Sequence, residues 1–140
     1  MRKRTQAREL ALQLMYQLDL RGPEILDEIE ADLRETGDPE VAAFAREILF
    51  GCWERRAEID SKIEEVAKNW QLKRMAAIDR NILRLSTYEL LFRDDIPPLV
   101  TINEAIEVAK KYSTKNSGPF VNGILDNIRL KCAPPHKQKK

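Results

Sequence analysis

The sequence predicts an all-α protein that forms a compact bundle of about six or seven helices. Apolar residues recur every three or four positions through most of the chain, which is the spacing of a half-buried helix. No segment shows the strict alternation of apolar and polar residues that is typical of a strand. The 140 residues are 43% hydrophobic, 34% charged and 6% aromatic, which suits one water-soluble domain with a single core.

The first two predicted helices are marked by apolar faces and by glycine at their ends. The first covers about residues 4–20 and stops at Gly22-Pro23. Its apolar face consists of Ala7, Leu10, Ala11, Leu14 and Leu18. The second covers about residues 24–36 and ends at Gly37. Asp38 followed by Pro39 then predicts a helix start, because aspartate caps an N-terminus and proline is favoured at the first helical position.

The middle of the chain carries an apolar stripe from Val41 to Trp70. This stripe fits either one long helix or two helices with a bend, and we expect one because Gly51 alone is a weak breaker. After a short joint near residues 71–73, a further helix is predicted up to Pro97-Pro98. Its apolar positions are Ile78, Ile82, Leu85, Tyr88, Leu91 and Phe92.

Two more helices are predicted near the C-terminus. Thr101 and Glu104 have the spacing of a capping box, in which each side chain binds the other residue's backbone N–H, so a helix is expected to start there and to run to about Tyr112. After the loop "STKNSGPF", the last helix is predicted from Pro119 to Leu130. Residues 1–132 are thus expected to form one helical domain, and residues 133–140 a basic, disordered tail.

The distribution of charge predicts binding to an anion at the ends of the chain. The net charge is +1, but residues 1–8 and 130–140 each carry four Lys or Arg and no acid, which leaves 16 basic against 23 acidic residues between them. The basic ends suit a partner such as nucleic acid, and the acidic body suits a basic partner.

Several functional classes are excluded by residues that the chain lacks. The only histidine is His136, in the tail, so the body can assemble no histidine-based catalytic or metal site. Cys52 and Cys132 are far apart and are expected to be reduced thiols. The sequence shows no phosphate-binding loop and no apolar run long enough to span a membrane, and no apolar stretch follows the basic start as a signal peptide requires, so we expect neither an anchor nor a signal peptide. We therefore expect a cytoplasmic binding protein, neither an enzyme nor a membrane protein, with no cofactor and no metal.

The basic start is the strongest candidate for a binding site. Arg4 and Arg8 are four residues apart on one helix face, with Arg2 and Lys3 ahead of them, and guanidinium groups can grip phosphate bidentately. An ordinary solubilising tail is the alternative. Tyr16 lies near the same side and could stack on a base of single-stranded RNA, although core packing also explains it.

Four segments together resemble the NusB family of bacterial transcription antitermination factors. They are the arginine-rich start leading into "ARELALQLMY", then "RNILRLSTYELL", "IPPLVTINEAIEVAKKY" and "FVNGIL". The resemblance covers almost the whole chain. It implies two three-helix sub-bundles, and binding of boxA, a single-stranded element of ribosomal RNA leaders, jointly with NusE, a ribosomal small-subunit protein. It also implies assembly with other Nus factors and RNA polymerase, and self-association into a homodimer occurs in some members.

The resemblance also implies particular site residues. The family's RNA-contacting start falls on Lys3, Arg4 and Arg8, its first-helix aromatic on Tyr16, and its phenylalanine before "VNG" on Phe120, which its apolar neighbours alone would assign to the core. For contact with NusE we expect the middle helices around Asp79, Tyr88 and Glu89.

Two other functional classes stay open at this point. A helical protein–protein scaffold would need the acidic body and would treat the basic ends as solubilising. A stand-alone relative of the RNA-binding domain of RNA cytosine methyltransferases is the second alternative, and it would need another polypeptide for catalysis.

Overall fold

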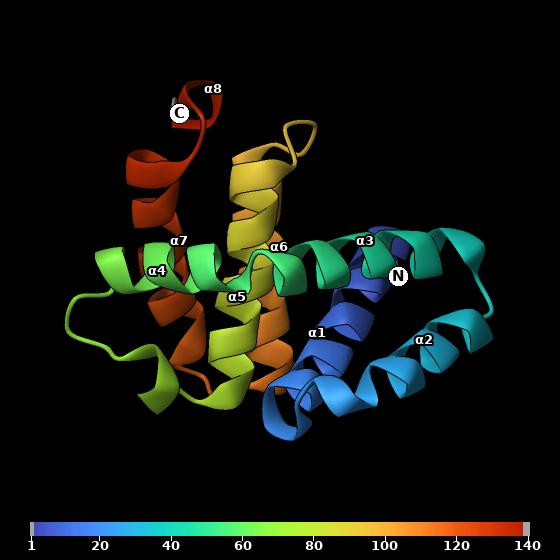
Figure 1. Ribbon diagram of the computed structural model, residues 1–140. Helices are drawn as coiled ribbons and strands as arrows, with labels where there is room; N and C mark the ends of the chain where they lie inside the picture. The colour runs from blue at the N-terminus through green and yellow to red at the C-terminus, as the bar shows by residue number, and fades with distance from the viewer. Residues whose placement is uncertain (1, 139–140) are drawn as a thin grey trace.

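The computed structural model describes residues 2–138, and every regular element in this range is a helix. The predicted all-α class is confirmed (Figure 1). The α-helices are α1 (Lys3–Arg21), α2 (Leu26–Glu35), α3 (Pro39–Glu54), α4 (Arg56–Val66), α5 (Ala77–Phe92), α6 (Pro98–Tyr112), α7 (Ser117–Cys132) and α8 (Pro135–Gln138). Two 3-10 turns, Pro23–Ile25 and Leu72–Arg74, precede α2 and α5.

The helices form two groups that share one core. In the first group α1 packs against α3, and α2 lies beside α3; in the second, α5, α6 and α7 pack against one another. Figure 1 shows α3 and α4 running almost end to end across the molecule, so that α3 belongs to the first group while α4 crosses α5 and α7. Because α1 and α3 also contact α5, that helix lies at the centre of the bundle.

The core is made by the apolar faces that the sequence predicts. Leu14 and Leu18 of α1, Ile48 of α3, and Leu83 and Leu90 of α5 are almost completely buried. Burying one such side chain contributes about 1.5–3 kcal/mol, so this shared core is the main force that joins the two groups.

The expectation of one long helix from Val41 to Trp70 is wrong, because the chain bends at Arg55. Its φ and ψ are −106° and 19°, outside the helical range, and its N–H bonds to the carbonyl oxygens of Gly51 and Cys52. The bend lets α3 pack on α1 while α4 packs on α7. A regular apolar stripe does not reveal that its two halves face different neighbours.

The predicted capping box is also wrong, because α6 begins three residues earlier, at Pro98. Thr101 lies inside the helix, and its hydroxyl donates to Glu89 Oε1 at 2.9 Å. Glu104 accepts hydrogen bonds from α1 instead, from Thr5 Oγ1 at 2.6 Å and from Arg8 Nη1 at 3.3 Å. Both side chains therefore connect helices and do not cap one.

The tail is ordered where the structure describes it, which corrects the expectation of disorder for residues 133–138. Residues 135–138 form α8, and Lys137 is only 1% exposed. Its Nζ donates to the carbonyl oxygens of Glu89, at 2.8 Å, and Arg93. The carbonyl oxygen of Arg93 lies just past the end of α5, where helical partners run out, so the lysine satisfies an acceptor that the helix leaves free. The carbonyl oxygen of Glu89 already accepts the Arg93 N–H, and the lysine is a second donor to it. Residues 139–140 lie outside the described part.

None of the helices within residues 2–138 combines the length and the hydropathy that a membrane-spanning helix needs.

Candidate nucleic-acid interface

The first basic residues lie at the N-terminal end of α1, where neighbouring groups hold them. Arg2 is exposed at the cap position of α1. Lys3 Nζ lies 3.4 Å from carboxylate oxygens of both Asp38 and Glu40, and its interactions with these two acids raise the pKa of Lys3 above its usual value. The Arg4 guanidinium lies over the Phe44 ring, 4.5 Å from its centroid. Cation–π and ionic contacts therefore fix this end of α1 on α3.

Arg8 is buried, and its guanidinium is occupied by acids from the second helix group. Nε and Nη2 donate to Glu89 at 2.9 Å each, a bidentate pair, and Nη1 reaches Glu104. The side chains of Arg8 and Glu89 are only 9% and 2% exposed. Arg8 thus joins α1 to α5 and α6, and this placement leaves it no open side toward a phosphate.

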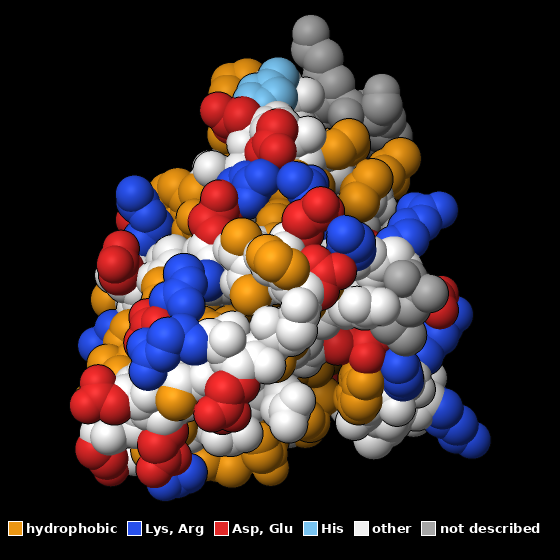
Figure 2. Space-filling model, turned by 90° about the vertical axis from the view of Figure 1, so that its right-hand side faces the viewer, with side chains coloured by type: hydrophobic (Ala, Val, Ile, Leu, Met, Phe, Trp, Pro, Cys, Tyr) orange, Lys and Arg blue, Asp and Glu red, His pale blue; other side chains and the backbone are white. Residues whose placement is uncertain are grey.

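The charges around this end of the molecule are mixed. Figure 2 shows a face on which Lys and Arg side chains lie interspersed with Asp and Glu, with no large continuous basic patch. Lys3 and Arg8 of the basic start are therefore paired with acids, whereas Arg2 and Arg4 are exposed.

Tyr16 borders a groove between α1, the start of α5 and the end of α6. The groove has a volume of about 420 Å³. Its other lining residues are Gln6, Glu9, Leu10, Leu12, Gln13, Ile78 and Tyr112. Tyr16 is half-buried and Tyr112 is 45% exposed, so two phenol rings share this groove. The Tyr112 hydroxyl donates to Glu9, which also binds Lys111 Nζ at 3.0 Å.

Phe120 lies in the first turn of α7, half-buried against Trp70. The two ring centroids are 5.4 Å apart and the rings meet edge-on at 76°. Together they line a second pocket of about 260 Å³, which also includes Asp79. Since Ile78 lines the Tyr16 groove and Asp79 the Phe120 pocket, the two aromatic sites flank the same end of α5.

Sequence reasoning missed Trp70 and Tyr112 as parts of these sites. Trp70 closes an apolar stripe and looks like a core residue, but α4 ends at Val66 and leaves the indole outside the helix. Tyr112 continues the apolar face of Val108 and Ala109, so no signal in the sequence marks its ring as exposed at the end of the helix.

The residues expected to contact a partner are buried. Asp79 is 9% exposed, and its two oxygens accept hydrogen bonds from the Ser113 and Ser117 hydroxyls. The Tyr88 ring packs so closely on Gly51 that a Cβ there would overlap it, and burial raises the pKa of Tyr88. Glu89 holds Arg8. These three side chains offer a partner little surface because α5 is the central helix of the bundle, and their contact with NusE stays a prediction.

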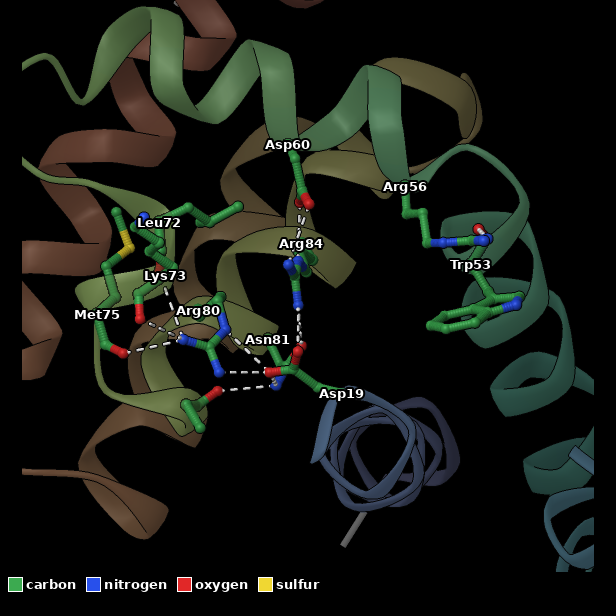
Figure 3. A network of polar contacts seen from close by, with 11 residues as sticks. Asp19, Trp53, Arg56, Asp60, Leu72, Lys73, Met75, Arg80, Asn81 and Arg84 are labelled. Carbon is green, nitrogen blue, oxygen red and sulfur yellow. Dashed lines mark hydrogen bonds and ion pairs between the residues drawn. The ribbon is translucent and has the colours of Figure 1, made fainter. Parts of the chain in front are cut away.

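A polar network fixes the connection between α4 and α5 (Figure 3). Arg80 Nε donates to Asp19 Oδ2 of α1 at 2.9 Å, and Nη1 donates to the carbonyl oxygens of Leu72, Lys73 and Met75. Arg84 lies between Asp19 and Asp60. Its Nε and Nη2 donate to the two carboxylate oxygens of Asp60 at 2.8 and 3.0 Å, and it also forms an ion pair with Asp19. Burial opposes ionisation of Asp19, but hydrogen bonds from Arg80 and Asn81 and the nearby arginine charges outweigh it and hold the pKa of Asp19 below its usual value.

Residues 2–138 form no evident metal-binding site and present no activated nucleophile. That range holds no group of three or more His, Cys, Asp or Glu side chains placed to bind a metal ion. Burial raises the pKa of the Cys52 thiol to about 12, so the thiolate needed for attack is not formed near neutral pH.

The sequence and the helical arrangement have a common counterpart among known proteins. The model of the NusB family matches residues 5–129. The chain belongs to the NusB family. The transcription antitermination protein NusB of Geotalea uraniireducens is 47% identical over 137 residues, which cover 91% of this chain and 94% of the relative.

Solved NusB structures have the same fold. The structure of T. maritima NusB superposes with a TM-score of 0.88 at 46% identity, covering 96% of this chain and 95% of the other. A structure of the antitermination factors NusB and NusE in complex with double-stranded RNA gives a TM-score of 0.77 at 31% identity, covering 91% and 96%. The family resemblance and the two helix groups that it implies are thus confirmed.

Proposed function

We propose that this chain is a transcription antitermination factor that binds the single-stranded boxA element of ribosomal RNA leaders together with NusE. In this role it helps to assemble RNA polymerase and the other Nus factors into an antitermination complex in the cytoplasm. It acts by binding and carries no catalytic residues. Membership of the NusB family supports the proposal, as does the match to a structure that joins NusB, NusE and RNA.

The pair of aromatic sites on either side of the start of α5 carries the proposal. Single-stranded RNA is recognised through bases that splay out and stack on aromatic rings, and Tyr16 and Phe120 are each half-exposed beside a pocket. Exposed Arg2 and Arg4, with Lys3, supply positive charge at the far end of α1.

The proposed RNA-facing set is therefore Arg2, Lys3, Arg4, Tyr16 and Phe120. Arg8 is a positioning residue, because its bidentate pair with Glu89 fixes the direction of α1. Asp79 has a similar role, since its bonds to Ser113 and Ser117 hold the connection that precedes Phe120. We propose that NusE binds the acidic surface around these connections, with Tyr88 supporting it from the core.

The test is fluorescence anisotropy of a labelled boxA-type RNA and of a scrambled RNA, each with this protein alone and with NusE added. We expect selective binding that NusE strengthens. Tyr16→Leu and Phe120→Leu should each weaken it about tenfold, since one stacked base contributes about 1–3 kcal/mol. Leu99→Ala is the control, because Leu99 is an exposed apolar residue at the start of α6.

The salt dependence of RNA binding distinguishes this function from that of a protein–protein scaffold that does not bind RNA. If Arg2, Lys3 and Arg4 neutralise three phosphates, raising salt from about 50 to about 200 mM should weaken binding roughly 20-fold. Equal and weak binding to both RNAs, unaffected by NusE, would favour the scaffold.

A further inference from the structure

Trp70 is the most exposed aromatic side chain within residues 2–138, at 57%. It meets Phe120 edge-on, and an edge-to-face contact covers at most one face of the indole. The remaining surface is open to solvent directly beside a residue of the proposed RNA-facing set. An aromatic ring that is open to solvent on one side can accept a stacked base.

Several cations without partners lie close to this ring along the chain. Within the described part of the chain, four exposed side chains form no ion pair, side-chain hydrogen bond or ring contact and either line the pocket, as Arg74 does, or lie within two residues of a lining residue in the sequence, as do Lys68, Lys73 and Lys115. Lys3 and Arg8, by contrast, are held by acids. Positive charge that no acid holds is therefore available near Trp70 as well as at Arg2 and Arg4.

The pocket between the two rings suits one flat ring system. Its volume of about 260 Å³ is below the about 300–1,000 Å³ of pockets for drug-sized molecules. Arg74 and Asn116 line it beside the aromatic rings, and these side chains can hydrogen-bond to the edge of a base.

The segment that carries Trp70 is held in place before any ligand arrives. Leu72 and Met75 are buried, and Arg80 binds the carbonyl oxygens of residues 72, 73 and 75. A fixed platform loses little conformational freedom on binding, which favours affinity.

We propose that Trp70 stacks on an RNA base and extends the RNA-binding surface past Phe120, with Lys68, Lys73, Arg74 and Lys115 contacting the phosphates. The inference rests on the proposed function and adds to it a second aromatic platform and the cations that serve it. The strand would pass from the Tyr16 groove across the start of α5 to Phe120 and then Trp70.

Tryptophan fluorescence tests this stacking directly, because the chain has two tryptophans. In a Trp53→Phe variant, Trp70 is the remaining emitter, and its emission should be quenched as boxA-type RNA is added. The quenching should saturate together with the anisotropy of the labelled RNA. In the matched Trp70→Phe variant, the emission of Trp53 should stay constant, because Trp53 packs under Arg56 and lies across the polar network from Lys73 and Met75 (Figure 3).

Affinity gives the second readout. Trp70→Leu should weaken RNA binding about tenfold, and Trp70→Tyr should retain most of it. If the wild-type chain binds boxA-type RNA but Trp70→Leu binds equally well and the Trp70 emission is unchanged, the platform is refuted while the proposed function stands. If the wild-type chain shows no selective binding, both fail.

A protein partner on this surface is the remaining outcome. If Trp70→Leu weakens the complex with NusE, measured without RNA, and leaves RNA binding intact, Trp70 belongs to a protein interface and the stacking proposal is overturned.

Discussion

The start of α1 and the connection before α5 are both rich in Lys and Arg, yet their side chains are used in opposite ways. Arg8 is buried in a bidentate pair with Glu89, and Lys3 is held between Asp38 and Glu40. Lys68, Lys73 and Arg74 are exposed and have no ionic partner. The two regions differ because the fold brings acids to the start of α1. Glu89, for example, lies 81 positions after Arg8 in the sequence. Charge available for a ligand is therefore a property of the fold and not of the local sequence.

The two regions should also differ in what a substitution changes. A buried ion pair contributes little net stability, because desolvation offsets the attraction, but removing one partner leaves an uncompensated charge. An exposed and unpaired cation contributes almost nothing to stability, so its loss is felt only by a ligand.

The largest expected effect is that of Arg8→Met. The substitution leaves the Glu89 carboxylate buried without its cation, and we expect the free energy of unfolding to fall by about 3–5 kcal/mol. Urea unfolding followed by circular dichroism measures it. Arg34→Met is the matched control, since Arg34 is largely exposed and 4.0 Å from Glu30. Equal losses for the two variants would remove the distinction between the regions.

A smaller effect is expected from Asp19→Asn, in the network that supports the Trp70 segment. At neutral pH the loss of charge-assisted hydrogen bonds to Arg80 and Arg84 should cost about 1.5–3 kcal/mol. The pKa of Asp19 is depressed in the folded state, so its contribution is present above the unfolded pKa of about 3.9 and is lost as the pH falls through the lower folded value.

The difference between wild type and Asp19→Asn should therefore shrink as unfolding is measured from pH 7 down to pH 3. Asp32→Asn, at an exposed position of α2, should show little difference at any pH. If the difference in unfolding free energy between the wild type and Asp19→Asn stays constant over this pH range, the charge of Asp19 does not have the role expected of it.

The smallest effect is expected from Lys73→Gln. Its stability should stay within about 0.5 kcal/mol of the wild type, while the slope of log K against log salt for RNA binding should decrease by about 0.7, the loss of one phosphate contact. Lys131→Gln, at the end of α7, removes an exposed cation elsewhere and should leave the slope unchanged. An equal change in both variants would mean that the charge acts only through the net charge of the protein.

Much of the fold was predictable because helical periodicity is a local property. The helix starts at Pro39 and near Ala77 follow from cap residues and apolar spacing. The bend at Arg55 was not predictable, because it depends on which helices α3 and α4 meet. The Thr101 and Glu104 pair had the right spacing for a cap, but acceptors and donors on α1 and α5 compete for both side chains.

The candidate site was less predictable than the fold. Tyr16 followed from its position on a predicted helix, but Phe120 was found only through the family resemblance, since its neighbours are apolar. The sequence suggests an exposed Arg8 and a buried Trp70, whereas in the structure Arg8 is buried and Trp70 is exposed. Burial of a charge requires knowledge of its distant partner, and exposure of a tryptophan requires knowledge of where α4 ends.

Glu89 holds Arg8 through its carboxylate and Lys137 through its carbonyl oxygen, which gives the assembly of the bundle an order in time. A ribosome adds residues at roughly 5–20 per second, so Lys137, 48 positions after Glu89, is added about 2 to 10 s later. Arg8 has already been made when Glu89 is added, whereas the carbonyl group of Arg93, just past α5, stays in contact with water until Lys137 is made. During synthesis, the N-terminal helix can therefore dock before the far end of α5 receives its lysine.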